Sequence, residues 1–409
     1  MQVIKKPKIL IPKNVNFEKW ATIACDQFCA RPKYWKELEE AIADSPSTYK
    51  ITFPEICLSM KNIDEKIKSV WAEMDSYLKH DLFKEVNNLI LVEREVENGK
   101  KRLGLMVCIN LDMYNWERVR IPIRATEDTL LERLPVRIKI RSKAEVELPH
   151  AIVLIDNPEK NIIESIYAKR NSLKCLYDFN LNMGGGNIKG YEVNNSDEVI
   201  AQIHALLDPS TQKAKYKHDA GILLAVGDGN HSIATAKLHW ENLKKTLSEK
   251  EQKDHPAKYM LVELINLYGE GMDFKPIHRI VYNPDDKYVE GLKQALKGNG
   301  KIKIIYKGKE EYIAAPEKAS FAIQAVQKYI DAQIKLRPEI EVEYVHNDDH
   351  LMEAIEDFKG DSLGIVMPEF PRDELLGFVL EEGNLPKKAF SIGEPEHKRY
   401  YLEARKIVE

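Results

Sequence analysis

Apolar runs of strand length recur along the chain, and several end in residues that favour turns. The runs at 88–95 and 103–111 are separated by Asn98-Gly99, a pair typical of a tight hairpin turn. A hairpin is therefore predicted there. Further runs of the same kind predict strands at 151–156, 221–226, 259–267 and 274–282.

Segments with helical character lie between these strands. Pro32 stands at the start of such a segment at 32–42, and favourable helix formers follow residue 233. A further helix is expected at 196–207, and helix and strand patterns alternate beyond about residue 284. The whole pattern predicts the α/β class with a mixed α+β core.

One short segment predicts a strand with two different faces. Between residues 136 and 141, apolar positions alternate with Arg137, Lys139 and Arg141. An extended backbone would place the three basic side chains on one face. Such a face could attract phosphate groups, although a strand of this kind more often exposes it to solvent.

Three regions differ in their pattern. Residues 1–158 form an N-terminal mixed α/β region, and residues 159–283 form a core that carries a glycine-rich loop. Residues 284–409 form a C-terminal α/β accessory region with few chemical candidates. No internal repeat or long linker marks the boundaries.

Composition and charge narrow the class of protein. The 409 residues carry a formal net charge of only -4, which argues against a dedicated nucleic-acid partner and leaves a small-molecule substrate open. No run is apolar for the roughly 20 residues that a membrane helix needs, so a cytoplasmic protein without a membrane partner is expected. The five cysteines are read as reduced thiols, with a metal site at Cys25 and Cys29 as the minor alternative. A homo-oligomer is left open.

The strongest candidate for chemistry is the loop Gly227-Asp228-Gly229-Asn230-His231-Ser232, directly after the apolar run 221–226. Its two glycines allow positive φ and close approach of a ligand, and the next helix offers N–H groups to an anion. Asp228 could bind magnesium or a substrate hydroxyl, and the polar side chains after Gly229 can donate hydrogen bonds to phosphate oxygens. The alternative is a tight turn whose polar residues only cap the helix. The residues alone favour neither interpretation.

The segment GDGNHSIATAK resembles the hallmark of an uncharacterised family, domain of unknown function 1015, in which a strand ends in an Asp-Gly-(His/Asn)-His motif. Further segments along nearly the whole chain support the resemblance. They are ACDQF at 24–28 with Tyr34-Trp35, LVERE at 91–95, IRATE at 123–127, ELPH at 147–150, LYDF at 176–179 with the triple glycine at 184–186, PIHR at 276–279 and FSIGE at 390–394.

That family is similar, more distantly, to the ParB/sulfiredoxin-like nucleotide-binding proteins and to the free serine kinases built on them. The resemblance implies a ParB/sulfiredoxin-like nucleotide-binding core with additional α/β regions, in which the loop and helix start hold nucleotide phosphates. Asp228, Gly229 and His231 match the kinase-like loop. Ser232 departs from it, because many relatives have an arginine there, and a lost guanidinium removes a bidentate phosphate clamp.

The resemblance therefore implies a kinase, an ATP- or ADP-dependent phosphotransferase that uses Mg2+ and phosphorylates a hydroxyl, with free L-serine as the leading acceptor. Phosphoryl transfer needs positioning, positive charge and a group that orients the nucleophile. The predicted catalytic residues are Asp26, Glu127, Asp228 and His231, with Asp228 also the candidate metal ligand. The predicted nucleotide- or phosphate-binding residues are Gly227, Gly229, Asn230, Ser232, Arg124, His278 and Arg279.

Each candidate outside the loop has a structural alternative. Asp26 would equally serve as a helix or turn cap, and Arg124 and Glu127 would form a mutual surface ion pair. His278 and Arg279 are adjacent on an extended segment, so they are expected to point to opposite faces, and His278 could be satisfied by the backbone. Two other functions stay open, a ParB-like nucleotide-binding switch and a metal-dependent phosphohydrolase.

Overall fold

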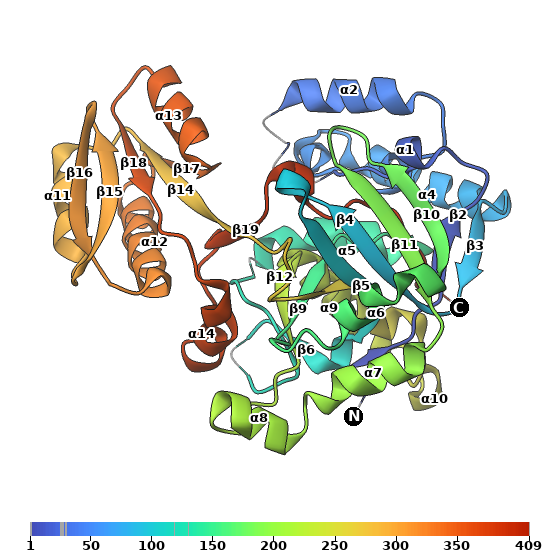
Figure 1. The fold of residues 1–409 in the computed structure, drawn as a ribbon. Helices are drawn as coiled ribbons and strands as arrows, with labels where there is room; N and C mark the ends of the chain where they lie inside the picture. The colour runs from blue at the N-terminus through green and yellow to red at the C-terminus, as the bar shows by residue number, and fades with distance from the viewer. Residues whose placement is uncertain (1, 25–27, 29–30, 118, 130, 409) are drawn as a thin grey trace. The chain divides into compact units, whose positions relative to one another are not determined.

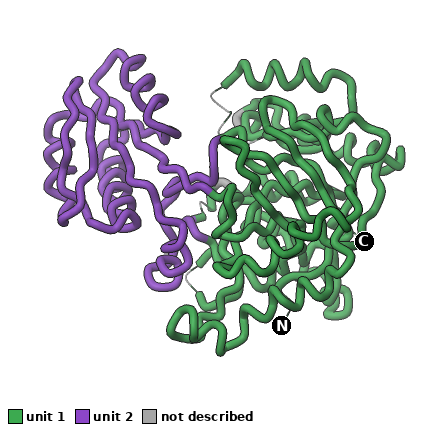
Figure 2. The backbone as a smooth tube through the Cα atoms, in the orientation of Figure 1, with its two compact units in different colours: residues 1–125, 129–272, 395–409 green, residues 126–128, 273–394 purple. Residues whose placement is uncertain are grey.

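The computed structural model describes residues 2–24, 28, 31–117, 119–129 and 131–408. The chain divides into two units, shown in Figure 2. Unit 1 comprises Met1–Ala125, Thr129–Met272 and Pro395–Glu409, and unit 2 comprises Thr126–Asp128 and Asp273–Glu394. The chain thus returns to unit 1 at its end. The region boundary expected near residue 158 lies inside unit 1, and the one near residue 283 lies inside unit 2.

Unit 1 is built on a ten-stranded mixed sheet with the strand order β10-β11-β4-β5-β13-β9-β12-β7-β6, and β1 pairs with β5 (Figure 1). Two small pairs, β2-β3 and β20-β8, lie outside it. The strands are β1 (Ile4–Lys5), β2 (Ile9–Pro12), β3 (Phe83–Val86), β4 (Leu89–Glu95), β5 (Lys101–Asn110), β6 (Tyr114–Asn115), β7 (Ile123–Arg124), β8 (Val146–Glu147), β9 (Ile152–Ile155), β10 (Lys174–Asn180), β11 (Asn187–Val193), β12 (Leu224–Asp228), β13 (Tyr259–Asn266) and β20 (Arg405–Lys406).

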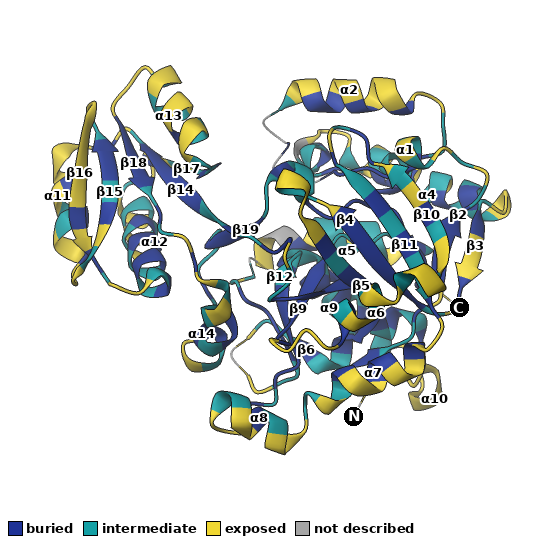
Figure 3. Ribbon diagram, in the orientation of Figure 1, coloured by how far each residue is buried: buried dark blue, intermediate teal, exposed yellow. Residues whose placement is uncertain are grey.

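Both faces of this sheet are covered, because alternate residues of its central strands enter two separate cores. Ile90 and Met106 belong to one core, whereas Leu91 and Leu105 belong to the other. The central strands β4 and β5 are accordingly buried along most of their length (Figure 3). The helices of unit 1 are α1 (Phe17–Trp20), α2 (Pro32–Ile42), α3 (Thr48–Ile51), α4 (Ile63–Lys79), α5 (Leu134–Ser142), α6 (Ile163–Ala168), α7 (Ser196–Ala205), α8 (Pro209–Tyr216), α9 (Asn230–Lys244) and α10 (Glu249–Gln252).

Unit 2 has a six-stranded sheet with the order β16-β15-β18-β14-β17, and β19 pairs with the start of β14. Its strands are β14 (Phe274–Tyr282), β15 (Gly300–Tyr306), β16 (Lys309–Ala315), β17 (Glu341–His346), β18 (Ser362–Val366) and β19 (Phe390–Ile392). Its helices are α11 (Asp286–Ala295), α12 (Ala319–Leu336), α13 (Asp348–Asp357) and α14 (Leu375–Glu381).

Most elements predicted from the pattern are confirmed. The hairpin of β4 and β5 turns at Asn98 and Gly99, which take φ values of 59° and 71°. Helix α2 has the predicted bounds, with Pro32 in its first turn. The mixed α/β class is thereby confirmed. Among the described residues, no helix is both long and apolar enough to cross a membrane.

The predicted strand at 136–141 is wrong, because these residues belong to helix α5. The segment has a second periodicity, in which Leu134 and Ile138 are one helical turn apart and pack on the same core. The basic residues pair with carboxylates, since Arg137 binds Glu55, Lys139 binds Asp64 and Arg141 binds Glu147, each at 2.6 Å. The expected basic face therefore does not exist.

The cysteines that the structure describes have free thiols. Cys57 and Cys108 are buried, and Cys175 is exposed. Cys25 and Cys29, the alternative metal ligands, lie outside the described residues.

Candidate active site

The glycine-rich loop joins β12 to α9, and the backbone requires a glycine at position 229. Strand β12 pairs antiparallel with β9, and the register shifts between Val226 and Asp228, at Gly227. Gly229 has a φ of 83°, and a Cβ there would lie 2.8 Å from the Cβ of Ala151. An L side chain would therefore be strained and would collide with the residue before β9.

Helix α9 begins at Asn230 without a side-chain cap. Ser232 and Ile233 donate their N–H groups to the Gly229 carbonyl, both at 3.0 Å. The helix-cap alternative expected from the sequence therefore does not account for the polar residues of the loop. The N-terminal end of the α9 dipole is left at the loop, where it favours an anion.

Asp228 is fixed by two donors. Its Oδ1 accepts the N–H of Gly229 at 2.8 Å, and its Oδ2 accepts the ammonium of Lys398 at 2.9 Å. The side chain of Lys398 is 8% exposed and that of Asp228 is 28% exposed, so the ammonium is largely shielded from water and the carboxylate less so. Lys398 is a residue that the sequence prediction missed.

The C-terminal return of the chain positions Lys398. Arg94 donates to the Lys398 carbonyl at 2.7 Å, and Arg102 donates to the His397 carbonyl at 2.8 Å. The next residue, Arg399, binds Glu263 at 2.6 Å and also contacts Glu403. Because all these side chains are buried, the backbone at Lys398 is held on both sides.

Two further loop residues have defined surroundings. The hydroxyl of Ser232 lies 3.1 Å from Nε2 of His150, whose ring packs edge-on against Tyr401 with centroids 5.1 Å apart. Asn230 is 8% exposed, and its Oδ1 has no hydrogen-bond partner among the described residues. The loop thus holds a buried acceptor that a ligand donor would satisfy.

Arg124 reaches the same edge of the sheet from the neighbouring strand. Strands β7 and β12 are parallel, with Arg124 opposite Ala225, so their carboxyl ends lie at one edge. Arg124 is buried. It supplies a second cationic residue on the strand next to the one that carries Asp228.

The other predicted residues are placed differently. Asp26 lies outside the described residues. Glu127, His278 and Arg279 belong to unit 2, where Oε1 of Glu127 accepts the N–H of Ala389 at 3.3 Å. His278 is satisfied within the fold, because its Nδ1 accepts the N–H of Met367 at 3.0 Å and its Nε2 lies 2.8 Å from Asp348. Burial lowers the pKa of His278 below its ordinary value, which favours the neutral ring.

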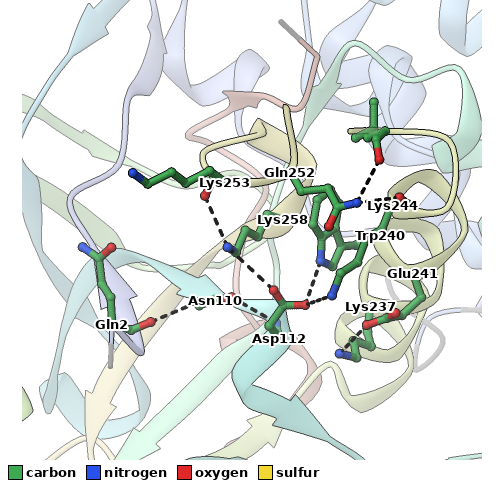
Figure 4. Close-up of polar contacts among 11 residues, drawn as sticks. Gln2, Asn110, Asp112, Lys237, Trp240, Glu241, Lys244, Gln252, Lys253 and Lys258 are labelled. Carbon is green, nitrogen blue, oxygen red and sulfur yellow. Dashed lines mark hydrogen bonds and ion pairs between the residues drawn. The ribbon is translucent and has the colours of Figure 1, made fainter. Parts of the chain in front are cut away.

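The second half of α9 is anchored to the segment that follows strand β5. Asp112, just after β5, accepts hydrogen bonds from Trp240 at 2.9 Å and from Lys244 at 3.1 Å, with Lys258 3.7 Å away (Figure 4). These contacts fix the helix whose first turn forms the loop. They are structural, since Asp112 lies near the side chains of the second half of α9 and not near its start.

The described part of the chain contains no group of three or more His, Cys, Asp or Glu side chains arranged to hold a metal ion. At the loop, Asp228 is the carboxylate that the sequence assigned to magnesium, and both of its oxygens have partners. The loop fits an anion better than a metal held by protein ligands alone. Its positive groups are the α9 N-terminus, Lys398 and Arg124.

Comparisons with known proteins gave a family and several similar folds. A profile of the family described as "Protein of unknown function (DUF1015)" matches residues 9–349. Among curated proteins, no sequence matches the chain. Similar solved structures include a conserved hypothetical protein from Pyrococcus furiosus, 13% identical with a TM-score of 0.38, which covers 74% of this chain and 95% of that one.

Free serine kinase in complex with AMP is also similar, at 11% identity and a TM-score of 0.41, over 74% of this chain and 92% of that one. TM-scores of this size mark a partial likeness in chain path and carry no information on matching side chains. The expected likeness to ParB/sulfiredoxin-like proteins stays a prediction.

Proposed function

The chain belongs to the family of proteins of unknown function DUF1015, and we propose that this member is a nucleotide-dependent small-molecule kinase. The observation that carries the proposal is the cationic start of α9. There the helix N-terminus and the Lys398 side chain lie at a glycine turn whose backbone a phosphate can approach closely, and the neighbouring strand β7 carries the buried Arg124.

The proposed reaction is transfer of the terminal phosphoryl group of ATP or ADP to a hydroxyl. The bond between the terminal phosphorus and its bridging oxygen breaks, a bond to the acceptor oxygen forms, and the acceptor proton passes to a base. The leading acceptor is free L-serine, which gives O-phosphoserine. This choice comes from the resemblance of the loop sequence to free serine kinases.

The loop residues would divide the work between them. The first N–H groups of α9 and Lys398 would bind phosphate oxygens, and Arg124 would balance the charge of the transition state. Asp228 already accepts hydrogen bonds from Lys398 and from the Gly229 N–H, which makes it a better orienting group than a base. Mg2+, when bound, would be held mainly by nucleotide phosphates and would neutralise their charge.

Binding of the nucleotide is tested by calorimetric titration of the full chain with ATP and with ADP, with and without magnesium. Lys398→Met is expected to weaken binding at least about tenfold. Its matched control is Lys245→Met, which removes an exposed lysine at the far end of α9. Because Lys398→Met leaves Asp228 without its ammonium, the double variant with Asp228→Asn shows how much of the loss is due to the unpaired carboxylate.

Transfer is tested by incubating the protein with nucleotide, magnesium and single free amino acids, and by detecting phosphorylated product with 31P NMR. L-Serine should give product and L-alanine, which lacks a hydroxyl, should give none. Asp26→Asn and Glu127→Gln identify the base by which of them loses transfer while binding persists. If nucleotide binds and no amino acid yields product, the kinase is refuted. Slow hydrolysis without acceptor would then favour the nucleotide-binding switch, and cleavage of phosphate monoesters would favour the phosphohydrolase.

A further inference from the structure

One face of the sheet in unit 2 gathers polar side chains that the loop chemistry does not use. Along β14, His278 lies on the face of α13, where it contacts Asp348, and alternation places Arg279 on the opposite face. Tyr344 is the register partner of Arg279 on β17 and shares that face. Gln327 of α12 reaches the same point, since its Nε2 donates to the Tyr344 hydroxyl at 2.9 Å.

Arg279 is a buried cation with an unused binding edge. It has no exposed surface, its Nη1 donates to the Ile277 carbonyl, and its guanidinium lies 5.0 Å from the centroid of the Tyr344 ring. Among the described residues, its Nε and Nη2 have no hydrogen-bond partner. Nε and Nη2 are the two parallel donors that grip a carboxylate in bidentate fashion.

Burial lowers the pKa of Arg279 to about 10, with Tyr344 and Glu127 acting in the opposite direction. The group is therefore charged at neutral pH. A buried charge without a partner is costly, so a bound anion would stabilise this arrangement. A second cation, Lys387, lies 5.8 Å from the centroid of the same Tyr344 ring.

Gln327 supplies a buried acceptor that has no donor. It is 1% exposed, and its Nε2 donates to Asp331 and to Tyr344, both at 2.9 Å. These two acceptors fix the orientation of the amide. Its Oε1 is then left buried without a donor among the residues described.

Gln327 and Asp331 line a cavity of about 790 Å3 in unit 2, within the size range of small-molecule sites. Charges of both signs surround it. The lining includes Asp128, Lys328 and Lys335, and burial raises the pKa of Asp128 above its ordinary value. A cavity lined in this way suits a ligand that carries both charges.

We propose that unit 2 binds a small zwitterion of the amino-acid class. The Nε and Nη2 edge of Arg279 takes its carboxylate, and Oε1 of Gln327 together with Asp331 takes its ammonium group. A simple dianion would meet the carboxylates of Asp331 and Asp128, and a simple cation would meet Arg279. The combination of an unused bidentate donor edge and an unused acceptor selects a ligand with both groups.

This site is independent of phosphoryl transfer, and its test avoids hydroxyl-bearing ligands. The full chain is titrated by calorimetry with L-alanine and L-glutamate, and with succinate and ethylamine, which each carry one kind of charge. The amino acids should bind at least about tenfold more tightly than either single-charge probe. Neither amino acid can accept a phosphoryl group on a hydroxyl, so the outcome does not depend on the kinase activity.

Variants locate the site. Arg279→Lys keeps the charge and removes the bidentate edge, and Gln327→Leu removes the acceptor; each should weaken L-alanine binding at least about tenfold. Gln333→Leu, on the same helix, and Arg337→Met, an arginine that already binds Asp285, are the matched controls and should bind normally. If Arg279→Lys does not fold, L-alanine binding by Gln327→Leu and by Asp331→Asn tests the site instead. Equal binding of all four probes, no binding of the amino acids, or unchanged binding by folded variants would overturn the proposal.

Discussion

Replacing Gly229 with alanine would disturb the loop in two separable ways. A non-glycine residue at a φ of 83° costs about 1–2 kcal/mol. The new methyl group would also lie 2.8 Å from Cβ and 2.9 Å from Cα of Ala151, and overpacking of this kind costs about 1–3 kcal/mol. Gly229→Ala is therefore expected to lower the free energy of unfolding of unit 1 by about 2–5 kcal/mol.

Ala151→Gly separates the two contributions. It removes the Cβ that the new methyl group would meet at 2.8 Å but keeps the Cα at 2.9 Å, so it should recover a part of the steric loss and leave the φ part unchanged. Alone it costs about 1 kcal/mol, because Ala151 is buried and glycine is the more flexible residue. The double variant should therefore show a favourable coupling energy that is smaller than the full steric loss of about 1–3 kcal/mol.

The assay uses the position of the tryptophans. All five of them, Trp20, Trp35, Trp71, Trp116 and Trp240, belong to unit 1, so urea unfolding followed by tryptophan fluorescence reports this unit. Gly99→Ala is the matched control, because Gly99 has a φ of 71° and nothing within 4 Å of an added Cβ. The reasoning is refuted if Gly229→Ala destabilises unit 1 no more than Gly99→Ala does, or if Ala151→Gly gives no coupling.

Three further outcomes are expected from unit 1. Asp112→Ala should lower its free energy of unfolding by about 1–3 kcal/mol, measured by the same urea titration, because Trp240 and Lys244 lose their acceptor. Burial opposes the charge of Glu147, but Arg405 and Arg141 hold its pKa below the ordinary value, so its contribution is present at higher pH and is lost as the pH falls below about 4.5. Glu147→Gln should flatten that part of a stability profile against pH, and an unchanged profile would contradict the assignment. Burial lowers the pKa of His239 to about 4, so protonation favours the unfolded chain and stability should fall between about pH 6.5 and pH 4; His239→Gln should remove this slope.

The sequence was sufficient to predict secondary structure where the local pattern of residues and their burial agree. The strand before the loop, the turn glycines and the helix after it were all predicted, because a buried run that ends in glycine and leads into helix formers has few other solutions. Helix α5 was mispredicted because Leu134 and Ile138 satisfy a helical spacing while Val136, Ile138 and Ile140 satisfy a strand spacing. Packing of Ile138 on the core decided between two patterns that the sequence alone leaves equal.

The residues that contact the loop from distant parts of the chain could not be predicted from local sequence patterns. Lys398 reaches Asp228 across 170 positions of the chain, and nothing near Lys398 marks it as a site residue. The segment FSIGE at 390–394 is part of the family resemblance, yet it ends just before the return to unit 1. His278 shows the opposite case, since its neighbours suggested a charge stabiliser and its buried contacts show a histidine that the fold already satisfies.

The charges at the loop bear on Ser232, the position where the resemblance led us to expect an arginine. Lys398 and Asp228 neutralise each other, so the pair adds orientation to the site more than net charge. The net positive potential must then come from the N-terminus of α9, from Arg124, and from the buried Arg102, whose pKa is lowered by burial and partly restored by Glu263 and Asp228. The hydroxyl of Ser232 lies 3.1 Å from Nε2 of His150, whereas an arginine at this position would add a further cation to the loop. Because like charges oppose each other where solvent is scarce, an arginine at 232 would have to be offset by a bound anion or by another carboxylate.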